Sequence, residues 1–284
     1  MTKLSRDTAL VWVPVGSSEE EALARTTHLG VAAHQDDLEI MAVDGILQAF
    51  QREDAWFTGV VVTDGAGSPR DGLYRDQTDR AMREVRRLEQ QKAAFVGGYS
   101  AVVLLDHPSD VVKDGKEGGP EADIRAILEA TRPRVVYTHN LADKHDTHVA
   151  VALRTLAAIR SLAPEARPER LYGGEVWRDL DWLLDEDKVA FDLSAHENLQ
   201  AALVSVFDSQ ICGGKRYDLA TAGRRRAHAT YSASHGTDEA TSLTYALDMT
   251  PLVLDVSLDP WDHVARHIER FSADVKSRLR KLQA

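Results

Sequence analysis

The chain has 284 residues, enough for one large α/β domain or two small ones with a sizeable buried core. Hydrophobic residues make up 43% and charged residues 28%, which is typical of a globular protein and excludes a disordered or fibrous chain. The 34 Lys and Arg against 45 Asp and Glu give a net charge of −11, which argues against a nucleic-acid partner.

The N-terminal segment contains one short apolar run, at residues 9–15, with no convincing cleavage site after it. Neither this run nor any other approaches the roughly 20 apolar residues of a membrane helix. We therefore expect a cytoplasmic protein without membrane insertion; whether it forms a homo-oligomer stays open. Cys212 is the only cysteine, which excludes an intrachain disulfide, and we expect it to be buried and inert.

Apolar runs rich in β-branched residues alternate with helical patterns in the first half of the chain. Strands are expected at His28–Ala33, Phe57–Thr63, Ala101–Leu105 and Arg134–Thr138, and helices at Leu38–Gln51, at Asp79–Val96 and from Pro120 to just before Pro133. This alternation predicts an α/β fold, a Rossmann-like, doubly wound, mostly parallel sheet with helices on both faces.

The second half of the chain has a weaker pattern. A helix runs through Val151 to Pro164, two strand-like segments follow at Leu171–Val176 and Lys188–Asp192, and a last helix begins at Asp259. The apolar stripe of this last helix favours core packing over a subunit contact. Without repeats or a clear linker, we expect residues 1–284 to form a single domain, with core motifs in 27–160 and a C-terminal elaboration in 165–284.

Titratable side chains follow all four expected strands of the first half, where ligands of open α/β sheets bind. These side chains are His34, Asp36 and Asp37 after the first strand, Asp64 after the second, Asp106 after the third, and His145 and His148 after the fourth.

The spacing of these residues points to a metal site. His34 and Asp37 are three residues apart at a helix start, so their side chains can converge on one ion. His145 and His148 have the same spacing, on a helix that we expect Asp143 to cap. One of these two histidines can complete a site of two His and one Asp, which holds Zn²⁺ with open positions. Each motif alone is also compatible with an ordinary helix-capping turn.

Residues 33–39, Ala-His-Gln-Asp-Asp-Leu-Glu, resemble the AHPDDxE signature of the LmbE/PIG-L superfamily of zinc-dependent N-acetylglucosaminyl deacetylases. Further matches are residues 61–65 with its TDG turn, Arg86, Glu89, Ala93 and Gly97 with its helix motif, and Asp143, His145 and His148 with its D-x-H-x-x-H motif. The resemblance covers roughly residues 27–160. Gln35 stands where the family usually has Pro, which would loosen the turn, and Thr147 replaces the Asp that usually precedes the second His.

The resemblance implies that His34, Asp37 and His148 bind one Zn²⁺ per chain, although Fe²⁺ or another divalent metal would also suit these ligands. Asp36 would accept the proton of the attacking water. His145 would stabilise the oxyanion and protonate the departing amine. The implied reaction removes an N-acetyl group from an N-acetylglucosamine-type amino sugar conjugate, a small-molecule substrate, and yields acetate and a free amine.

Three alternatives stay open. The first is a hydrolase of the same family acting on another amide, such as a sugar-thiol conjugate. The second is a non-haem Fe(II) oxygenase, which uses a similar ligand set but, by family analogy, is expected on a different fold. The third is a sugar-binding protein that has lost turnover, as the departure at Thr147 would allow.

Substrate contacts are harder to predict than metal ligands. Asp64, Arg70 and Asp106 could hydrogen-bond sugar hydroxyls, with solvated loop residues as the alternative. The run Arg224 to Arg226 is expected to be a solvated helix face rather than a contact for an acidic substrate.

Overall fold

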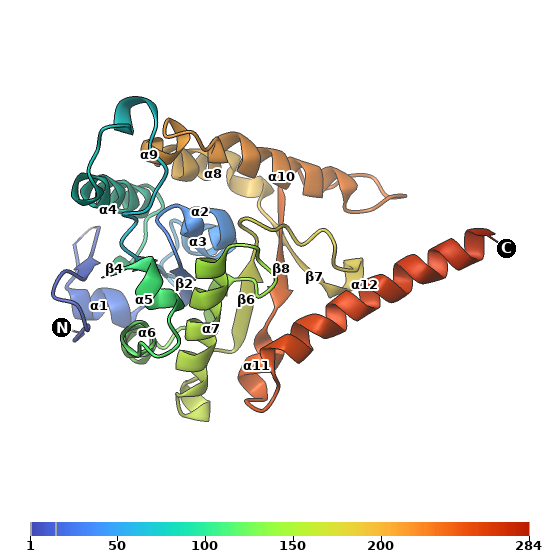
Figure 1. Ribbon diagram of the computed structural model, residues 1–284, viewed down its shortest axis with the longest axis horizontal. Coiled ribbons are helices and arrows are strands. Elements are labelled where there is room, and N and C mark those ends of the chain that lie inside the picture. Colours follow the sequence, from blue (N-terminus) through green and yellow to red (C-terminus); the bar gives the residue numbers. More distant parts are fainter. Residues whose placement is uncertain (1, 15, 284) are drawn as a thin grey trace.

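The computed structural model describes residues 2–14 and 16–283, and its centre is one eight-stranded sheet (Figure 1). The strands lie in the order β1-β4-β3-β2-β5-β6-β8-β7. Their bounds are β1 Leu10–Trp12, β2 His28–Ala32, β3 Phe57–Thr63, β4 Ala101–His107, β5 Val135–His139, β6 Arg170–Gly174, β7 Lys188–Asp192 and β8 Leu243–Asp248.

The five central strands, β4-β3-β2-β5-β6, are parallel, and antiparallel strands complete both edges. From β2 the chain first adds β3 and β4 on one side and then returns to add β5 and β6 on the other. The order therefore reverses between β2 and β5, which is where open α/β sheets bind ligands. The predicted doubly wound, mostly parallel α/β sheet is confirmed.

Helices cover both faces of the sheet, as predicted (Figure 1). Their bounds are α1 Glu19–Ala24, α2 Asp37–Met41, α3 Val43–Ala49, α4 Asp79–Val96, α5 Ser109–Lys113, α6 Gly119–Thr131, α7 Asp146–Arg160, α8 Glu197–Ser205, α9 Asp208–Ile211, α10 Tyr217–Tyr231, α11 Thr250–Leu254 and α12 Pro260–Gln283. None of them is long and apolar enough to cross a membrane, within the residues described.

Two apolar clusters hold these layers together, one on each face of the sheet. One cluster contains residues of α1, α6, α7 and α11, among them Ile127 and Leu156. The other contains residues of α2, α3, α4 and α8, among them Leu38 and Leu203. Neighbouring residues of β2 divide between them, with Val31 in the first cluster and Ala32 in the second, because successive strand side chains point to opposite faces.

Several details differ from the sequence prediction. The expected helix Leu38–Gln51 is two short helices, α2 and α3, because the backbone at Ala42 departs from helical values (φ −108°, ψ 16°). The strands β1 and β8 and the helices α1, α5 and α8 to α11 carried too weak a pattern to be predicted. Cys212 is exposed, so the prediction that it is buried is wrong.

The last helix, α12, projects from the body of the protein (Figure 1). Only His263 and Val264 of this helix are buried, and its stripe of Ile268, Phe271, Val275 and Leu279 is 40% to 56% exposed. The prediction of core packing is therefore wrong for all but the first turns. Arg270 pairs with Glu186 and Asp187 and fixes the helix at about its middle.

We expect that removing the residues after Phe271 changes the free energy of unfolding by less than about 1 kcal/mol, because these side chains have little packing to lose. Urea unfolding of the truncated and full chains measures the difference. A loss above about 2 kcal/mol that grows with protein concentration would contradict this and show that the stripe packs against a second copy in solution.

Candidate metal centre

The turn after β2 carries the first group of candidate residues. His34, Asp36 and Asp37 lie between the end of the strand and the first turn of α2. Asp36 has φ 94°, a value that residues other than glycine rarely adopt. The backbone N–H of His34 donates to Asp37 Oδ2 at 2.7 Å, which closes the turn and fixes the Asp37 carboxylate.

Arg86 of α4 holds this turn in place. Its buried guanidinium donates to the backbone oxygen of Gln35 and, at 3.4 Å, to the Gln35 side chain. A third nitrogen, Nη1, lies 3.6 Å from the Asp36 carboxylate. The Gln35 amide also donates to the Thr63 oxygen at 3.2 Å. Gln35 therefore ties the turn to β3 and α4, and the expectation that it loosens the turn is wrong.

The second group of candidate residues lies at the start of α7, after β5. The helix begins at Asp146, so Asp143 does not cap it as predicted. The Asp143 carboxylate instead accepts hydrogen bonds from the N–H groups of His145 (3.1 Å) and Trp177 (3.2 Å) and from His148 Nδ1 (3.3 Å). The bond to His148 leaves the other ring nitrogen, Nε2, free to act as an acceptor.

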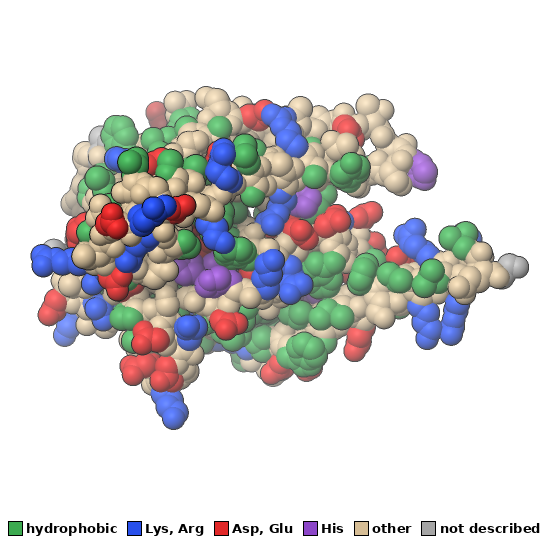
Figure 2. Space-filling view, turned by 45° about the horizontal axis from the view of Figure 1, so that its top comes forward, with side chains coloured by type: hydrophobic (Ala, Val, Ile, Leu, Met, Phe, Trp, Pro, Cys, Tyr) green, Lys and Arg blue, Asp and Glu red, His purple; other side chains and the backbone are tan. Residues whose placement is uncertain are grey.

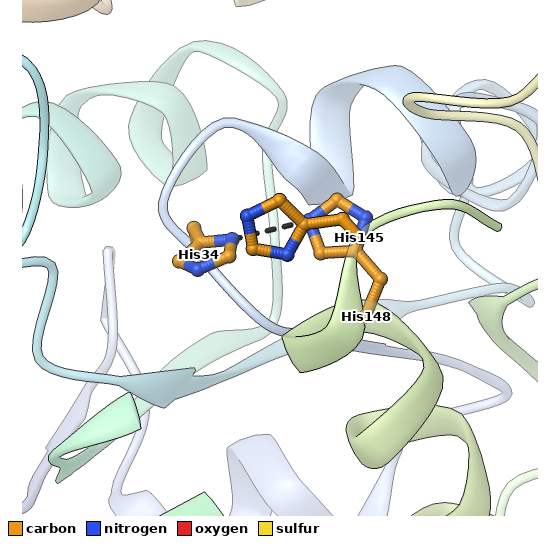
Figure 3. A group of neighbouring side chains, drawn as sticks. All are labelled: His34, His145 and His148. Carbon is orange, nitrogen blue, oxygen red and sulfur yellow. Dashed lines mark hydrogen bonds between the residues drawn. The ribbon is translucent and has the colours of Figure 1, made fainter. Parts of the chain in front are cut away.

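Three candidate ligand atoms meet between the two groups, and Figure 3 shows the imidazoles of His34 and His148 facing each other there. His34 Nδ1 lies 3.1 Å from Asp37 Oδ2 and 3.2 Å from His148 Nε2. His148 Nε2 lies 3.3 Å from Asp37 Oδ2. The three atoms thus form a nearly equilateral triangle.

This triangle fits a tetrahedral metal ion. Ligands bonded at about 2.0–2.1 Å in tetrahedral geometry are separated by about 3.3–3.4 Å, close to the three distances above. The Asp143 carboxylate behind His148 is the outer partner that metal-bound histidines usually have. His34, Asp37 and His148 therefore match the size and donor chemistry of a zinc site and leave its fourth position open.

His139 is a neighbouring histidine that the sequence analysis did not assign. Its ring stacks on His148 with centroids 3.9 Å apart, and its Nε2 lies 3.5 Å from Asp37 Oδ2. This nitrogen accepts the N–H of Ala33 at 2.9 Å, so its lone pair is already used. His139 thus positions the site rather than completing it. His139 is the last residue of β5, whereas the strand was expected to end at Thr138, one residue earlier.

The electrostatics favour a positive charge among the ligand atoms. Burial alone would raise the pKa of the Asp37 carboxyl, but the imidazoles of His148 and His139 outweigh it and hold the pKa well below its usual range. Burial lowers the pKa of His148, but Asp37 and Asp143 outweigh this effect and raise it. A proton or a metal ion would supply the favoured charge.

The two predicted catalytic side chains lie beside the triangle. Burial raises the pKa of Asp36 well above its usual value, against the effect of Arg86, and the neighbouring Asp37 raises it further. Burial and the nearby His148 and His34 lower the pKa of His145 to about 4, so its imidazole is neutral at pH 7.

A cavity of about 540 Å³ opens beside His34 and Asp37 of the metal triangle. Its lining combines candidate site residues, a loop after β3 and the start of α10. Side chains on its walls include His34, Asp36, Asp37, His145, Thr147, Ser68, Trp177, Gln210, Lys215 and Tyr217. Thr147 therefore faces the cavity at the position of the family's Asp, whereas Asp146 is exposed on the helix surface.

The three predicted substrate residues do not line this cavity. Asp106 pairs with Arg83, and Asp64 lies 3.8 Å from the same guanidinium, in a separate hollow beside α4. Arg70 donates to the backbone oxygens of Ala66 (2.6 Å) and Gln77 (3.0 Å) and so fixes the loop that borders the cavity.

The arginine run in α10 is neither a solvated face nor part of the cavity wall. Arg225 is buried and donates to the backbone oxygens of Glu39 and Ile40 in α2. Arg224 donates to the Val176 oxygen at 2.6 Å. Only Arg226 is exposed. The run thus attaches α10 to the elements that carry the candidate metal centre.

Comparison with known proteins shows what this arrangement is similar to. Residues 29–159 match the family model described as PIG-L, GlcNAc-PI de-N-acetylase. The match contains every candidate residue of the metal triangle and confirms the resemblance predicted from the motifs. No match to this chain was found among curated protein sequences.

Solved structures share the fold at low sequence identity. N,N′-diacetylchitobiose deacetylase from Pyrococcus horikoshii has a TM-score of 0.63 at 13% identity, covering 81% of this chain and 86% of its own. The conserved protein TT1542 from Thermus thermophilus has 0.59 at 20%, covering 79% and 94%. GalB, the 4-carboxy-2-hydroxymuconate hydratase from Pseudomonas putida, has 0.59 at 17%, covering 79% and 96%. At these identities the likeness establishes the fold alone.

Proposed function

We propose that the protein is a zinc-dependent hydrolase that removes an N-acetyl group from an N-acetylglucosamine-type conjugate, because residues 29–159 match the PIG-L family model. The family description supports a metal-dependent hydrolase. We add to it the identity of the metal, zinc, and the class of substrate, an N-acetylated amino sugar. Residues 1–284 would act as one domain, since β6 to β8 extend the same sheet, and the cytoplasmic location expected from the sequence belongs to the same proposal.

The observation that carries the proposal is the triangle of His34 Nδ1, Asp37 Oδ2 and His148 Nε2, with sides of 3.1 to 3.3 Å. Two nitrogens and one oxygen at this spacing suit zinc, and an Fe²⁺ site would accept the same donors. A bound zinc ion lowers the pKa of water to about 7 and polarises an acyl oxygen.

The chain's own residues would supply the proton transfers. Asp36 lines the cavity beside the metal triangle, so its carboxylate would accept the proton of an attacking water. Its raised pKa, caused mainly by burial, makes this carboxylate a stronger base than a solvated one. His145 is neutral and can donate an N–H to the acyl oxygen as negative charge develops there. The proton that Asp36 takes from water would then pass to the amine nitrogen as the C–N bond breaks, giving acetate and a free amine.

Water addition is a second reaction to test, because Thr147 lines the cavity where the family usually has Asp. The fold shared with the hydratase GalB does not by itself assign this chemistry. Addition of water to a carbon–carbon double bond would use the same water-activating residues without an amide. The two reactions give different products, so one assay panel separates them.

We expect zinc-loaded protein to release acetate and a primary amine from an N-acetylglucosamine conjugate, and to lose at least about 100-fold in rate after a chelator removes the metal. Acetate and amine are quantified together, and re-addition of zinc should restore the rate. An acyl product other than acetate would favour the sugar-thiol amide alternative. Water addition to an unsaturated acid without amide cleavage would contradict the deacetylase proposal.

A further inference from the structure

The wall of the cavity away from the metal triangle is built around Trp177. Its ring stacks near the His145 ring, with centroids 6.1 Å apart and planes 24° apart. Tyr217 meets it edge-on at 6.2 Å. A substrate whose acyl group reaches the metal triangle therefore lies against an aromatic surface, which suits the apolar face of a sugar ring.

Two lysines lie over this same ring without a carboxylate partner. Lys215 Nζ is 5.0 Å and Lys144 Nζ 5.9 Å from the centroid of Trp177. Lys188 provides a contrast elsewhere in the protein, since it lies 5.0 Å from the Tyr245 ring and also pairs with Asp181 and Asp185. Within the described residues, Lys144 and Lys215 form no such ion pair, and Lys215 lines the cavity.

Gln210 adds an unused donor on the same side of the cavity. Its side chain is only 3% exposed, and its Nε2 has no hydrogen-bond partner in the part of the chain that the structure describes. The backbone N–H of Lys215 donates to the Gln210 backbone oxygen at 2.9 Å, so the two residues are held together. A buried amide without a partner is costly, and an acceptor oxygen in the cavity would satisfy it.

The two carboxylates of the cavity have positively charged or imidazole neighbours, whereas the ammonium group of Lys215 has no carboxylate partner among the described residues. Asp36 lies near Arg86, and Asp37 is surrounded by imidazoles. The cavity therefore carries a positive charge at Lys215 that no described carboxylate neutralises, in a chain whose net charge is −11. In Figure 2, blue Lys and Arg side chains lie near the patch of purple histidine side chains to the left of the centre of the view.

We propose that Lys215 and Gln210, with Lys144 at the rim, bind an anionic group of the substrate, a phosphate or a carboxylate, while its sugar ring lies in the cavity beside Trp177. The proposal rests on the proposed function, because it places the acyl group at the metal triangle. It narrows the substrate class from amino sugars in general to those that carry a negative charge.

The test uses full-length, zinc-loaded protein with Asp36→Asn, so that bound ligands are not consumed. Calorimetry measures the Kd of N-acetylglucosamine, its 1-phosphate, its 6-phosphate and N-acetylglucosaminuronic acid. We expect at least one anionic probe to bind about tenfold more tightly than the neutral sugar, and Lys215→Met to remove that preference. The phosphate and carboxylate probes identify which anion is preferred. Lys276→Met, which removes the same charge from the projecting helix, is the control and should leave the preference intact.

Equal affinity for neutral and anionic probes, or no saturable binding of any anionic probe, would overturn the inference. So would a preference that Lys276→Met reduces as much as Lys215→Met, because the effect would then come from net charge. Cleavage by the wild type is measured separately. Anion-selective binding without amide cleavage would contradict the proposed function but support the anion site. Amide cleavage without anion selectivity would support the proposed function but contradict the anion site.

Discussion

Replacing His148 with alanine is expected to lower the metal content from about one ion per chain to below about 0.1. His148 Nε2 is one corner of the triangle, and the remaining pair, His34 and Asp37, offers only two donors. The hydrolytic rate should fall with the metal. Elemental analysis of untagged protein, purified with zinc present, measures the effect without any substrate.

The matched control is His235→Ala, which removes an exposed imidazole outside the site. It should keep the wild-type metal content. Unfolding curves of both variants show whether any loss of metal follows from loss of structure. Metal retained at the wild-type level in His148→Ala would mean that the triangle is not the metal site, and His34 and Asp37 would then serve only as a closed helix-start turn.

Replacing Asp36 with asparagine is expected to reduce kcat about 10²- to 10⁴-fold while the metal stays bound. Asparagine has nearly the same shape and remains beside Arg86, but it cannot accept a proton from water. The metal ligands are untouched by the change. Metal content and kcat measured on the same preparation separate the two properties.

The result that contradicts this role is a variant with near wild-type kcat. A variant that loses metal as well would show that Asp36 supports the turn rather than the chemistry. Its φ of 94° makes this distinction worth testing, since asparagine also tolerates positive φ and should preserve the backbone.

The three candidate metal ligands could be predicted from local spacing and strand order. The i, i+3 spacing of His34 with Asp37 places two candidate ligands within one turn, and the carboxyl end of β5 brings His148 to them. Local spacing alone could not choose between His145 and His148. That choice depends on Asp143, whose carboxylate accepts a hydrogen bond from His148 Nδ1 and so orients its ring. Hydrophobic periodicity does not predict such a contact.

The rest of the cavity could not be predicted because its walls come from segments far apart in the chain. These wall residues lie in loops (Trp177 and Lys215), in the four-residue helix α9 (Gln210) and at the first residue of α10 (Tyr217), where no periodic pattern marks them. Arg225 looked like part of a solvated charge run, yet it is buried against the carbonyl oxygens of α2. Hydrogen bonds between residues far apart in the chain, such as these, cannot be predicted from the spacing of residues within one segment.

Asp143 joins two parts of the site that would otherwise be independent. One carboxylate accepts hydrogen bonds from His148 and from the backbone of Trp177, so the metal ligand and the aromatic wall share a support. If metal binding at His148 shifts the Asp143 carboxylate, the same shift reaches the backbone of Trp177, and the resulting coupling between metal and cavity ligand is equal in both directions. Under the proposed function, the affinity for substrate would then depend on whether the metal is bound.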